Sequence, residues 1–113
     1  MADQVTLEAA NRDWVDEYQR TRDPSHFTQR TVQEWQELAR AAGLRPVRES
    51  IVPYRLEFAW WTGMAGCKDA QISKLLELLE YAPDEIQLKR HADGSPLAHS
   101  QSMLVVRFEQ RVA

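Results

Sequence analysis

Residues 22–49 read RDPSHFTQRTVQEWQELARAAGLRPVRE, and the prediction of the fold begins with this segment. Thr31 and Glu34 match a capping box, in which the threonine hydroxyl accepts a hydrogen bond from the third helical N–H and the glutamate reaches back to the cap. An apolar stripe follows at helical spacing, and Gly43 stands where a left-handed residue often ends a helix. Strand-forming residues come directly afterwards. The segment therefore predicts a capped helix within residues 23–45 that turns tightly into a β-strand, which is half of an α/β unit.

The composition limits the classes of function. The chain has 113 residues, of which 43% are hydrophobic and 27% charged, and this fits a single domain over residues 1–113. The formal net charge is −3 with both signs interspersed, whereas a nucleic-acid-binding surface is usually basic and clustered. The single Cys67 cannot form an internal disulfide, and the sequence shows neither a signal pattern nor an apolar run of membrane-spanning length. We expect a cytoplasmic protein with no nucleic-acid or membrane partner.

An amphipathic pattern over residues 5–21 predicts an N-terminal helix within residues 1–22. Pro24 ends it, because the residue before a proline is pushed out of the α region. Trp14 and Tyr18 lie on its apolar face, where they either fill the core or form a partner interface. A helix of this kind is able to pack on another chain, so we expect partner contact.

The segment over residues 46–58 predicts a strand with an irregularity. Its apolar phase slips between Ile51 and Val52, which suggests a bulge. Pro53 cannot donate to a ladder, so one side of the strand there must lack a partner or bulge away. We expect a strand to about Val52 and looser chain beyond it.

Two helical pieces are expected over residues 59–82, separated by Gly63 and Gly66. Asp93-Gly94 is the expected tight turn. Residues 100–110 are expected to form the final strand, and the run from Ser102 to Phe108 is apolar at nearly every position, as in a strand covered on both faces. Two strands make a marginal sheet with open edges. We expect the missing strands to come from a second copy of the chain or from a different protein.

Taken together, these segments resemble the C-terminal half of class I S-adenosylmethionine-dependent methyltransferases, particularly small-molecule enzymes of the quinone-biosynthesis-like type. The opening segment resembles the region after the fifth strand, and its sharpest motif is Asp23-Pro24-Ser25-His26 followed by Glu34-Trp35. LEFAWWTGMAG and CKDAQISKLLELLEYAPDE resemble two helices of a lid, and ADGSPLAHSQSMLVVRFEQ resembles the antiparallel seventh strand. The resemblance implies an α/β fragment, which on its own is α+β. It consists of helices and two late strands of a Rossmann-like sheet, with a helical lid insert between the strands.

The cofactor-binding half of that family has no counterpart in the sequence. Family members hold the cofactor with a glycine-rich turn after the first strand. This sequence has four glycines, and none forms a G-x-G. We therefore expect no cofactor to be bound by the chain alone, and S-adenosylmethionine to be present in a complete complex.

His26 is the candidate catalytic base, because an imidazole titrates near neutral pH and the resembled loop faces the substrate pocket in the family. The alternative is that His26 caps the following turn or bonds Asp23. Arg22 and Asp23 are expected to order the loop, by pairing with each other.

Four aromatic residues are expected to form a substrate-binding wall beside the lid, or in part to fill the core: Tyr54, Phe58, Trp60 and Trp61. We expect one of the two tryptophans to be buried and the other to face a pocket or partner. His91 and His99 are placed in a polar loop, and with Cys67 they show no metal-ligand spacing. We expect no metal site.

Two functions remain open. The first is an auxiliary subunit of a split methyltransferase, a heterodimer in which this chain supplies the lid and the last strands and is inactive alone. Its partner would carry the cofactor-binding half, and its substrate would be a small molecule. The alternative is a stand-alone homodimeric interaction or small-ligand-binding module derived from a methyltransferase.

Overall fold

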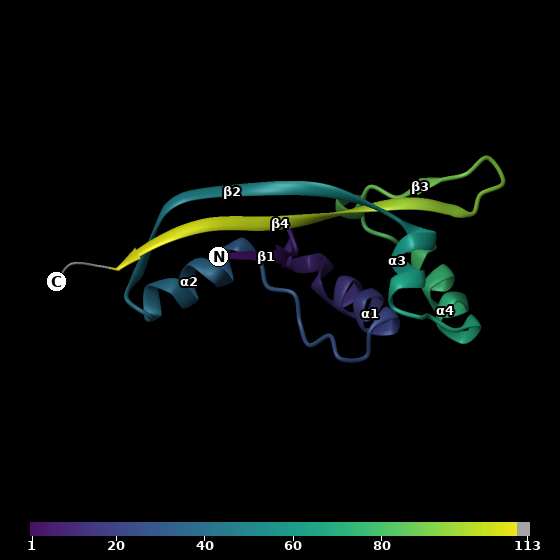
Figure 1. The fold of residues 1–113 in the computed structure, drawn as a ribbon, viewed down its shortest axis with the longest axis horizontal. Coiled ribbons are helices and arrows are strands. Elements are labelled where there is room, and N and C mark those ends of the chain that lie inside the picture. Colours follow the sequence, from purple (N-terminus) through teal and green to yellow (C-terminus); the bar gives the residue numbers. More distant parts are fainter. Residues whose placement is uncertain (111–113) are drawn as a thin grey trace.

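The computed structural model describes residues 1–110 and shows an α+β fold (Figure 1). Within these residues, four strands form one antiparallel sheet in the order β1–β4–β2, and β3 pairs with β4. The strands are β1 (Ala2–Val5), β2 (Leu44–Glu57), β3 (Lys89–Arg90) and β4 (Pro96–Gln110). The helices are α1 (Arg12–Arg22), α2 (Val32–Ala41), α3 (Phe58–Met64) and α4 (Asp69–Leu79), with short 3-10 turns η1 (Ala9–Asn11) and η2 (Asp84–Ile86). The predicted helical insert thus lies between two long strands, as expected.

The α2–β2 unit confirms the prediction made from the opening segment. The Thr31 hydroxyl accepts a hydrogen bond from the backbone N–H of Glu34, and the Glu34 carboxylate accepts one from the backbone N–H of Thr31. Gly43 has a φ of +76°, a conformation in which an L side chain is strained, and Leu44 begins β2 at the next residue. Local chemistry therefore sets both ends of this helix.

β2 is longer and more regular than expected. It runs unbroken through Pro53, which stands opposite Ser102 of β4, and the register shift lies between Pro46 and Arg48. The predictions of a bulge at Ile51 and of looser chain after Val52 are therefore wrong. Pro53 is tolerated because β2 is an edge strand: the nitrogen of Pro53 faces away from β4, where no ladder hydrogen bond is lost.

The N-terminal region also differs from its prediction. Residues 2–5 form β1 rather than helix, and α1 begins only at Arg12. β1 forms because Met1 and Val106 exchange backbone hydrogen bonds of 2.8 and 2.9 Å and the ladder continues to Val5. These partners are about a hundred residues apart in sequence, so no local pattern announces the strand.

The core lies in two clusters on different parts of the sheet. One joins α2 to the strands and contains Val5, Leu104 and Val106. The other joins α1, α3 and α4, with Leu75 among its fully buried members. Val105 is 42% exposed, so the expectation that β4 is covered on both faces fails at this position.

Gly66 and Gly94 lie in turns as predicted, whereas Gly63 lies inside α3, so the break expected at Gly63 is wrong. α3 ends before Gly66, which has a φ of +64°, and α4 begins at Asp69. Gly94 has a φ of +89°, and the Asp93 carboxylate accepts hydrogen bonds from the backbone N–H and hydroxyl of Ser95. This turn joins β3 to β4.

The described part of the chain is elongated. Its radius of gyration is 16.1 Å, whereas a compact domain of this length has a value of about 13 Å. The extents are 58 × 26 × 25 Å, because β2 and β4 run side by side along the whole molecule (Figure 1). α3 and α4 gather at one end of this ribbon and α2 lies toward the other, so much of the ribbon is uncovered.

Candidate functional site

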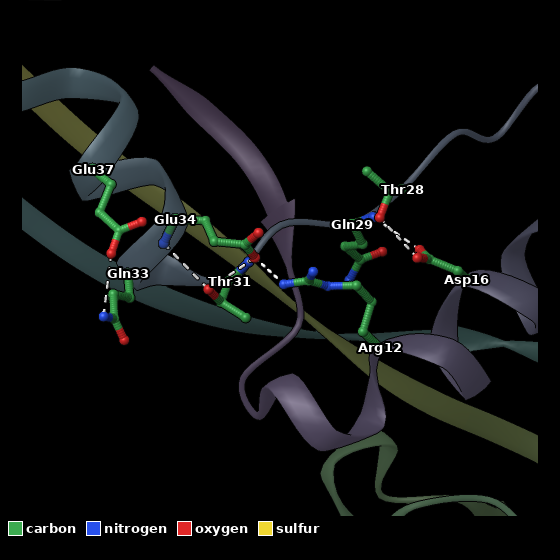
Figure 2. Close-up of polar contacts among 8 residues, drawn as sticks. All are labelled: Arg12, Asp16, Thr28, Gln29, Thr31, Gln33, Glu34 and Glu37. Atoms are coloured by element: carbon green, nitrogen blue, oxygen red, sulfur yellow. Dashed lines mark hydrogen bonds and ion pairs between the residues drawn. The ribbon is translucent and has the colours of Figure 1, made fainter. Parts of the chain in front are cut away.

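The Asp16 carboxylate fixes the loop that joins α1 to α2. One oxygen, Oδ1, accepts a hydrogen bond of 2.8 Å from the backbone N–H of Gln29 and lies 2.9 Å from Nε2 of His26. The other, Oδ2, accepts from the Thr28 hydroxyl at 2.8 Å. Figure 2 shows Thr28 and Gln29 turned toward Asp16 from this loop. A carboxylate on a helix thus holds three residues that are not helical.

The electrostatics of this cluster favour an ionised Asp16. Burial raises the pKa of Asp16, but hydrogen bonds from His26, Thr28 and the backbone of Gln29 together lower it by more, so the pKa lies below its usual value. Because the carboxylate oxygen accepts, Nε2 of a neutral His26 carries the proton and Nδ1 is the nitrogen free to take another. Carboxylate and imidazole therefore form a dyad suited to general base chemistry.

A second contact holds the far end of the same loop. The Arg12 guanidinium pairs with the Glu34 carboxylate, which also closes the capping box of α2 (Figure 2). The first turns of α1 and α2 are thereby tied together. His26 lies in the chain between this tie and the end of α1.

Arg22 and Asp23 order the loop separately rather than as a pair. The Asp23 carboxylate accepts hydrogen bonds from the backbone N–H and hydroxyl of Ser25, at 3.0 and 2.7 Å. The Arg22 guanidinium donates to the backbone carbonyl of Trp61 at 2.8 Å and lies over the Trp61 ring. The His26 side chain contacts Asp16, and the backbone N–H of His26 donates to the Asp23 carbonyl at 3.0 Å. The alternative that His26 bonds Asp23 is therefore seen in the backbone and not in the imidazole.

The aromatic residues of α1 form part of the chain's own core. Tyr18 stacks between Trp14 and Trp61, with ring centroids 4.8 Å apart in each pair. Tyr18 is 1% exposed, and the Trp14 indole N–H donates to the backbone carbonyl of Leu78 at 2.9 Å. Tyr18 is therefore unable to contact a partner, and Trp14 is committed to the α1–α4 contact. The predicted partner contact is therefore wrong for Tyr18, and both residues pack in the core, which is the alternative.

His99 is buried among these rings. It lies on β4 rather than in a polar loop, is 1% exposed, and meets Trp61 edge-on with ring centroids 4.7 Å apart. Its Nδ1 lies 3.4 Å from the Tyr18 hydroxyl. Burial, with a smaller effect from the Arg22 charge, lowers the pKa of His99 to about 4, so the ring is neutral at pH 7. Burial also raises the pKa of Tyr18.

A small cavity with both polar and apolar walls lies between His99 and the Asp16 loop. Its volume is about 20 Å³, and Tyr18, Gln29, His99 and Gln101 are among its lining residues. Gln29 Oε1 is buried without a hydrogen-bond partner in the part of the chain that the structure describes. A cavity of this size and polarity suits one water molecule rather than a substrate. The cavity is therefore too small to hold an organic substrate.

The four aromatic residues expected to form a substrate wall do not meet in one place. Trp61 is 2% exposed and Phe58 is also buried, so both belong to the core. Trp60 is 56% exposed and lines a shallow depression with Arg55 and Glu57. As expected, one of the two tryptophans, Trp61, is buried and the other, Trp60, is exposed.

Tyr54 lies on β2 and is engaged away from Trp60. Its hydroxyl donates to Gln101 Oε1 at 2.9 Å and accepts from the side-chain amide of Gln4. The contact connects the three strands β1, β4 and β2. Tyr54 therefore braces the sheet, and Trp60 is the member of the predicted wall that is most available to a ligand.

Residues 1–110 contain neither a cluster of metal ligands nor a membrane-spanning helix. No group of three or more potential metal ligands comes together there. None of the described helices is long and apolar enough to cross a membrane.

Comparisons with known proteins agree on the fold. No protein-family model matches the chain, and no curated protein matches it in sequence. The YcgJ protein of Bacillus subtilis superposes with a TM-score of 0.83 at 19% identity, over 99% of this chain and 50% of that one. BH2331 of Bacillus halodurans, a proposed methyltransferase, superposes with a TM-score of 0.86 at 14% identity, over 95% of this chain and 52% of that one. The chain thus has the fold of about half of a methyltransferase.

Proposed function

We propose that this chain is the auxiliary half of a split methyltransferase. It supplies the final strands of the sheet and the helical lid, and a partner subunit supplies the half that binds S-adenosylmethionine. The observation that carries the proposal is the coverage of the superpositions: 99% and 95% of this chain correspond to only 50% and 52% of the two solved chains. A half of such a fold needs its complement to form a substrate pocket.

Exposed apolar side chains and an unpaired sheet edge support this proposal. Val52 and Val105 lie on the face of the sheet opposite to Leu104, and they are 46% and 42% exposed. β1 ends the sheet with backbone groups that no further strand of the described chain pairs. A soluble domain usually covers both features, whereas this elongated chain leaves them open.

The residues of this chain do not fit the cofactor. Gly43, Gly66 and Gly94 adopt positive φ values, but they end helices or form a hairpin turn. A Cβ atom built on any of the four glycines meets nothing within 4 Å, so none of them lines a close-fitting cradle. This supports the proposal that the partner subunit binds the cofactor.

Three elements of this chain are proposed to serve the reaction. His26 would take a proton from the methyl acceptor through its free ring nitrogen, with Asp16 orienting the ring and stabilising the imidazolium. The lid helices α3 and α4 would exclude water, and the exposed Trp60 would contact a flat organic substrate. Small-molecule methylation is the activity this arrangement supports best.

The test is reconstitution with the neighbouring gene product that carries a G-x-G turn after a strand. Calorimetry measures S-adenosylmethionine binding to each polypeptide, and to the mixture. We expect no binding to this chain alone, binding to the partner, and consumption of the cofactor only when the mixture also contains a small-molecule acceptor. Tight cofactor binding by the isolated chain, or no complex between the two polypeptides, would overturn the proposal. A stable homodimer that ignores the partner would favour the alternative of a stand-alone module.

A further inference from the structure

The two outer edges of the sheet differ in their capacity to accept another strand. Met1 and Val106 exchange both of their backbone hydrogen bonds, so the backbone groups of Met1 face β4. In an antiparallel strand the direction alternates, so the N–H and C=O groups of every second residue of β1 point away from β4, toward the open edge. These are the groups of Ala2 and Gln4, which stand opposite Val105 and Met103.

The outward groups of β1 are open to a strand. The sequence of β1 contains no proline, so Ala2 and Gln4 both present an outward N–H. The next outward N–H, that of Thr6, donates to the backbone carbonyl of Arg30 at 3.0 Å, so the open part of the edge ends at Gln4. The Gln4 N–H donates to the carboxylate of the neighbouring Asp3 at 2.8 Å, and this contact is exposed. Because both partners of that bond are solvent-accessible, an incoming carbonyl can replace the carboxylate at little cost.

β2 presents a poorer edge. Pro46 and Pro53 both stand at positions whose nitrogen faces outward, opposite Phe108 and Ser102. Neither can donate a hydrogen bond to a further strand. A register shift follows Pro46, and charged side chains are spread along the strand. Prolines, bulges and charges are the devices with which proteins block pairing at an edge. The open edge is therefore that of β1.

An apolar groove lies next to this open edge. α2 and the residue after it contribute Trp35, Leu38, Ala39 and Ala42, and the other lining residues are Met1, which precedes β1, Leu44 of β2 and Phe108 of β4. We call this feature the α2 groove. Its volume is about 380 Å³, and Leu38 and Met1 are 46% and 42% exposed. Because Met1 precedes β1 directly, the groove and the β1 edge form one continuous surface.

We propose that the cofactor-binding partner docks on this surface through a strand–helix unit. Its strand pairs with β1, and its amphipathic helix lies in the α2 groove. This inference rests on the proposed function, because it names the place where the second half attaches. A strand added to β1 lies about 4.8 Å farther out, and a helix connected to it lies beside α2 on the same face of the sheet. Small residues on α2 allow close approach, and Leu38 and Met1 supply apolar anchors.

The choice of a different polypeptide over a second copy follows from the comparisons. The superpositions cover only 50% and 52% of the two solved chains, so about half of each lies outside the matched region. That remainder is large enough to supply both a strand and a helix.

The experiment measures partner binding by calorimetry with the full chain, and the probe is the G-x-G polypeptide used for reconstitution. Leu38→Glu places a charge in the groove, and Ala2→Pro removes an outward N–H from the edge. We expect each to weaken binding by at least about tenfold, since anchors at the centre of an interface carry most of its affinity. The matched control is Leu76→Glu on α4, which is 40% exposed in the native chain and outside the surface, and it should bind normally.

Hydrogen exchange of the complex, followed by NMR, gives a second reading that requires no variant. The amide of Gln4 should exchange at least about tenfold more slowly in the complex, and the amide of Ile51, which faces outward on β2, should not change. If the wild-type complex forms, but Leu38→Glu binds normally and exchange slows on β2 instead of β1, the proposed docking surface is wrong. The proposed function then still stands. If no complex forms, the proposed function itself fails. A dimer of this chain that buries the same groove would overturn the choice of occupant.

Discussion

Asp16 shows how one buried carboxylate can position a loop. The hydrogen-bond partners of Asp16 come from residues 26–29, and the carboxylate has few alternatives because the side chain is nearly enclosed. Asp16→Ala should lower the free energy of unfolding by about 1.5–3 kcal/mol, the range for hydrogen bonds to a charged group. Urea denaturation of the variant at pH 7 checks this. Asp93→Ala is the control: it removes a carboxylate with similar bonds to Ser95 from an exposed turn, and should cost less.

His99 predicts a dependence of stability on pH. Burial lowers its folded pKa to about 4 from an ordinary value of 6.5, so between these pH values the unfolded chain binds one proton more than the folded chain. The contribution of the neutral His99 to the free energy of unfolding is therefore fully present above about pH 6.5. It is lost as the pH drops toward 4, by on the order of 3 kcal/mol. His99→Phe keeps an aromatic edge against Trp61 and removes the titrating group. The slope of denaturation midpoint against pH in this interval should flatten in the variant; an unchanged slope would show that another group causes it.

Asp16 acts in a different pH interval. Its folded pKa is below the usual value of 3.8, so its contribution is complete above about pH 4 and is lost as the pH falls through the folded pKa. Acid unfolding of the wild-type chain should consequently show two ranges, with His99 acting first and Asp16 below it.

The two adjacent tryptophans of α3 allow a direct comparison of a buried ring with an exposed one. Trp61→Ala should lower the free energy of unfolding by about 3–5 kcal/mol, because it empties a buried site between Tyr18 and His99. Trp60→Ala should change it by less than about 1 kcal/mol, because that side chain is more than half exposed. Thermal or urea denaturation of both variants gives the comparison. Equal losses would contradict the burial on which the assignment of Trp60 to a ligand depends.

Only part of the candidate site is predictable from the sequence. The residue type and loop position of His26 mark it as a candidate base, but its partner Asp16 lies on the polar side of a helix pattern and carries no local signal. The sequence misplaces His99 because its neighbours, Ser100 and Gln101, are polar, although the strand buries all three at least in part. Burial of such residues depends on helices distant in sequence. The spacing of Trp14 and Tyr18 predicts an apolar helix face correctly, but not which surface covers it.

At the scale of elements, the capped helix α2 is the most predictable. Both of its ends depend on residues within four positions, so the Thr31 cap and Gly43 can be recognised directly. β1 and the full length of β2 are not predictable, because pairing with β4 rather than local preference creates them. Proline misleads the prediction for β2: only the sheet order reveals that the nitrogen of Pro53 faces the open edge.

The cap itself can be tested. Thr31→Ala removes the hydroxyl that accepts from Glu34 N–H, and it should lower the free energy of unfolding by about 1 kcal/mol. Gln33→Ala, in the same first turn but bonded through its side chain only to Glu37, is the control and should be nearly neutral (Figure 2). Urea denaturation measures both. A larger loss from the Gln33 variant would show that the capping box is not what stabilises the start of α2.

At the scale of the whole molecule, the described chain has the form of an incomplete sheet. Two strands of 14 and 15 residues form the long axis, and the helices cover only parts of them (Figure 1). Strands of this length are unusual in an isolated small domain, where most have roughly three to ten residues. A partner that binds only the folded chain should also stabilise it, because binding draws the equilibrium toward the native state.

The mass of the assembly in solution tests the proposed split most directly. Light scattering is recorded for this chain, for the polypeptide that carries the G-x-G turn, and for their mixture. We predict a 1:1 complex whose mass is the sum of the two polypeptides. A mixture that elutes as two separate species, with this chain unchanged in mass and stability, would contradict the division of the enzyme between two chains.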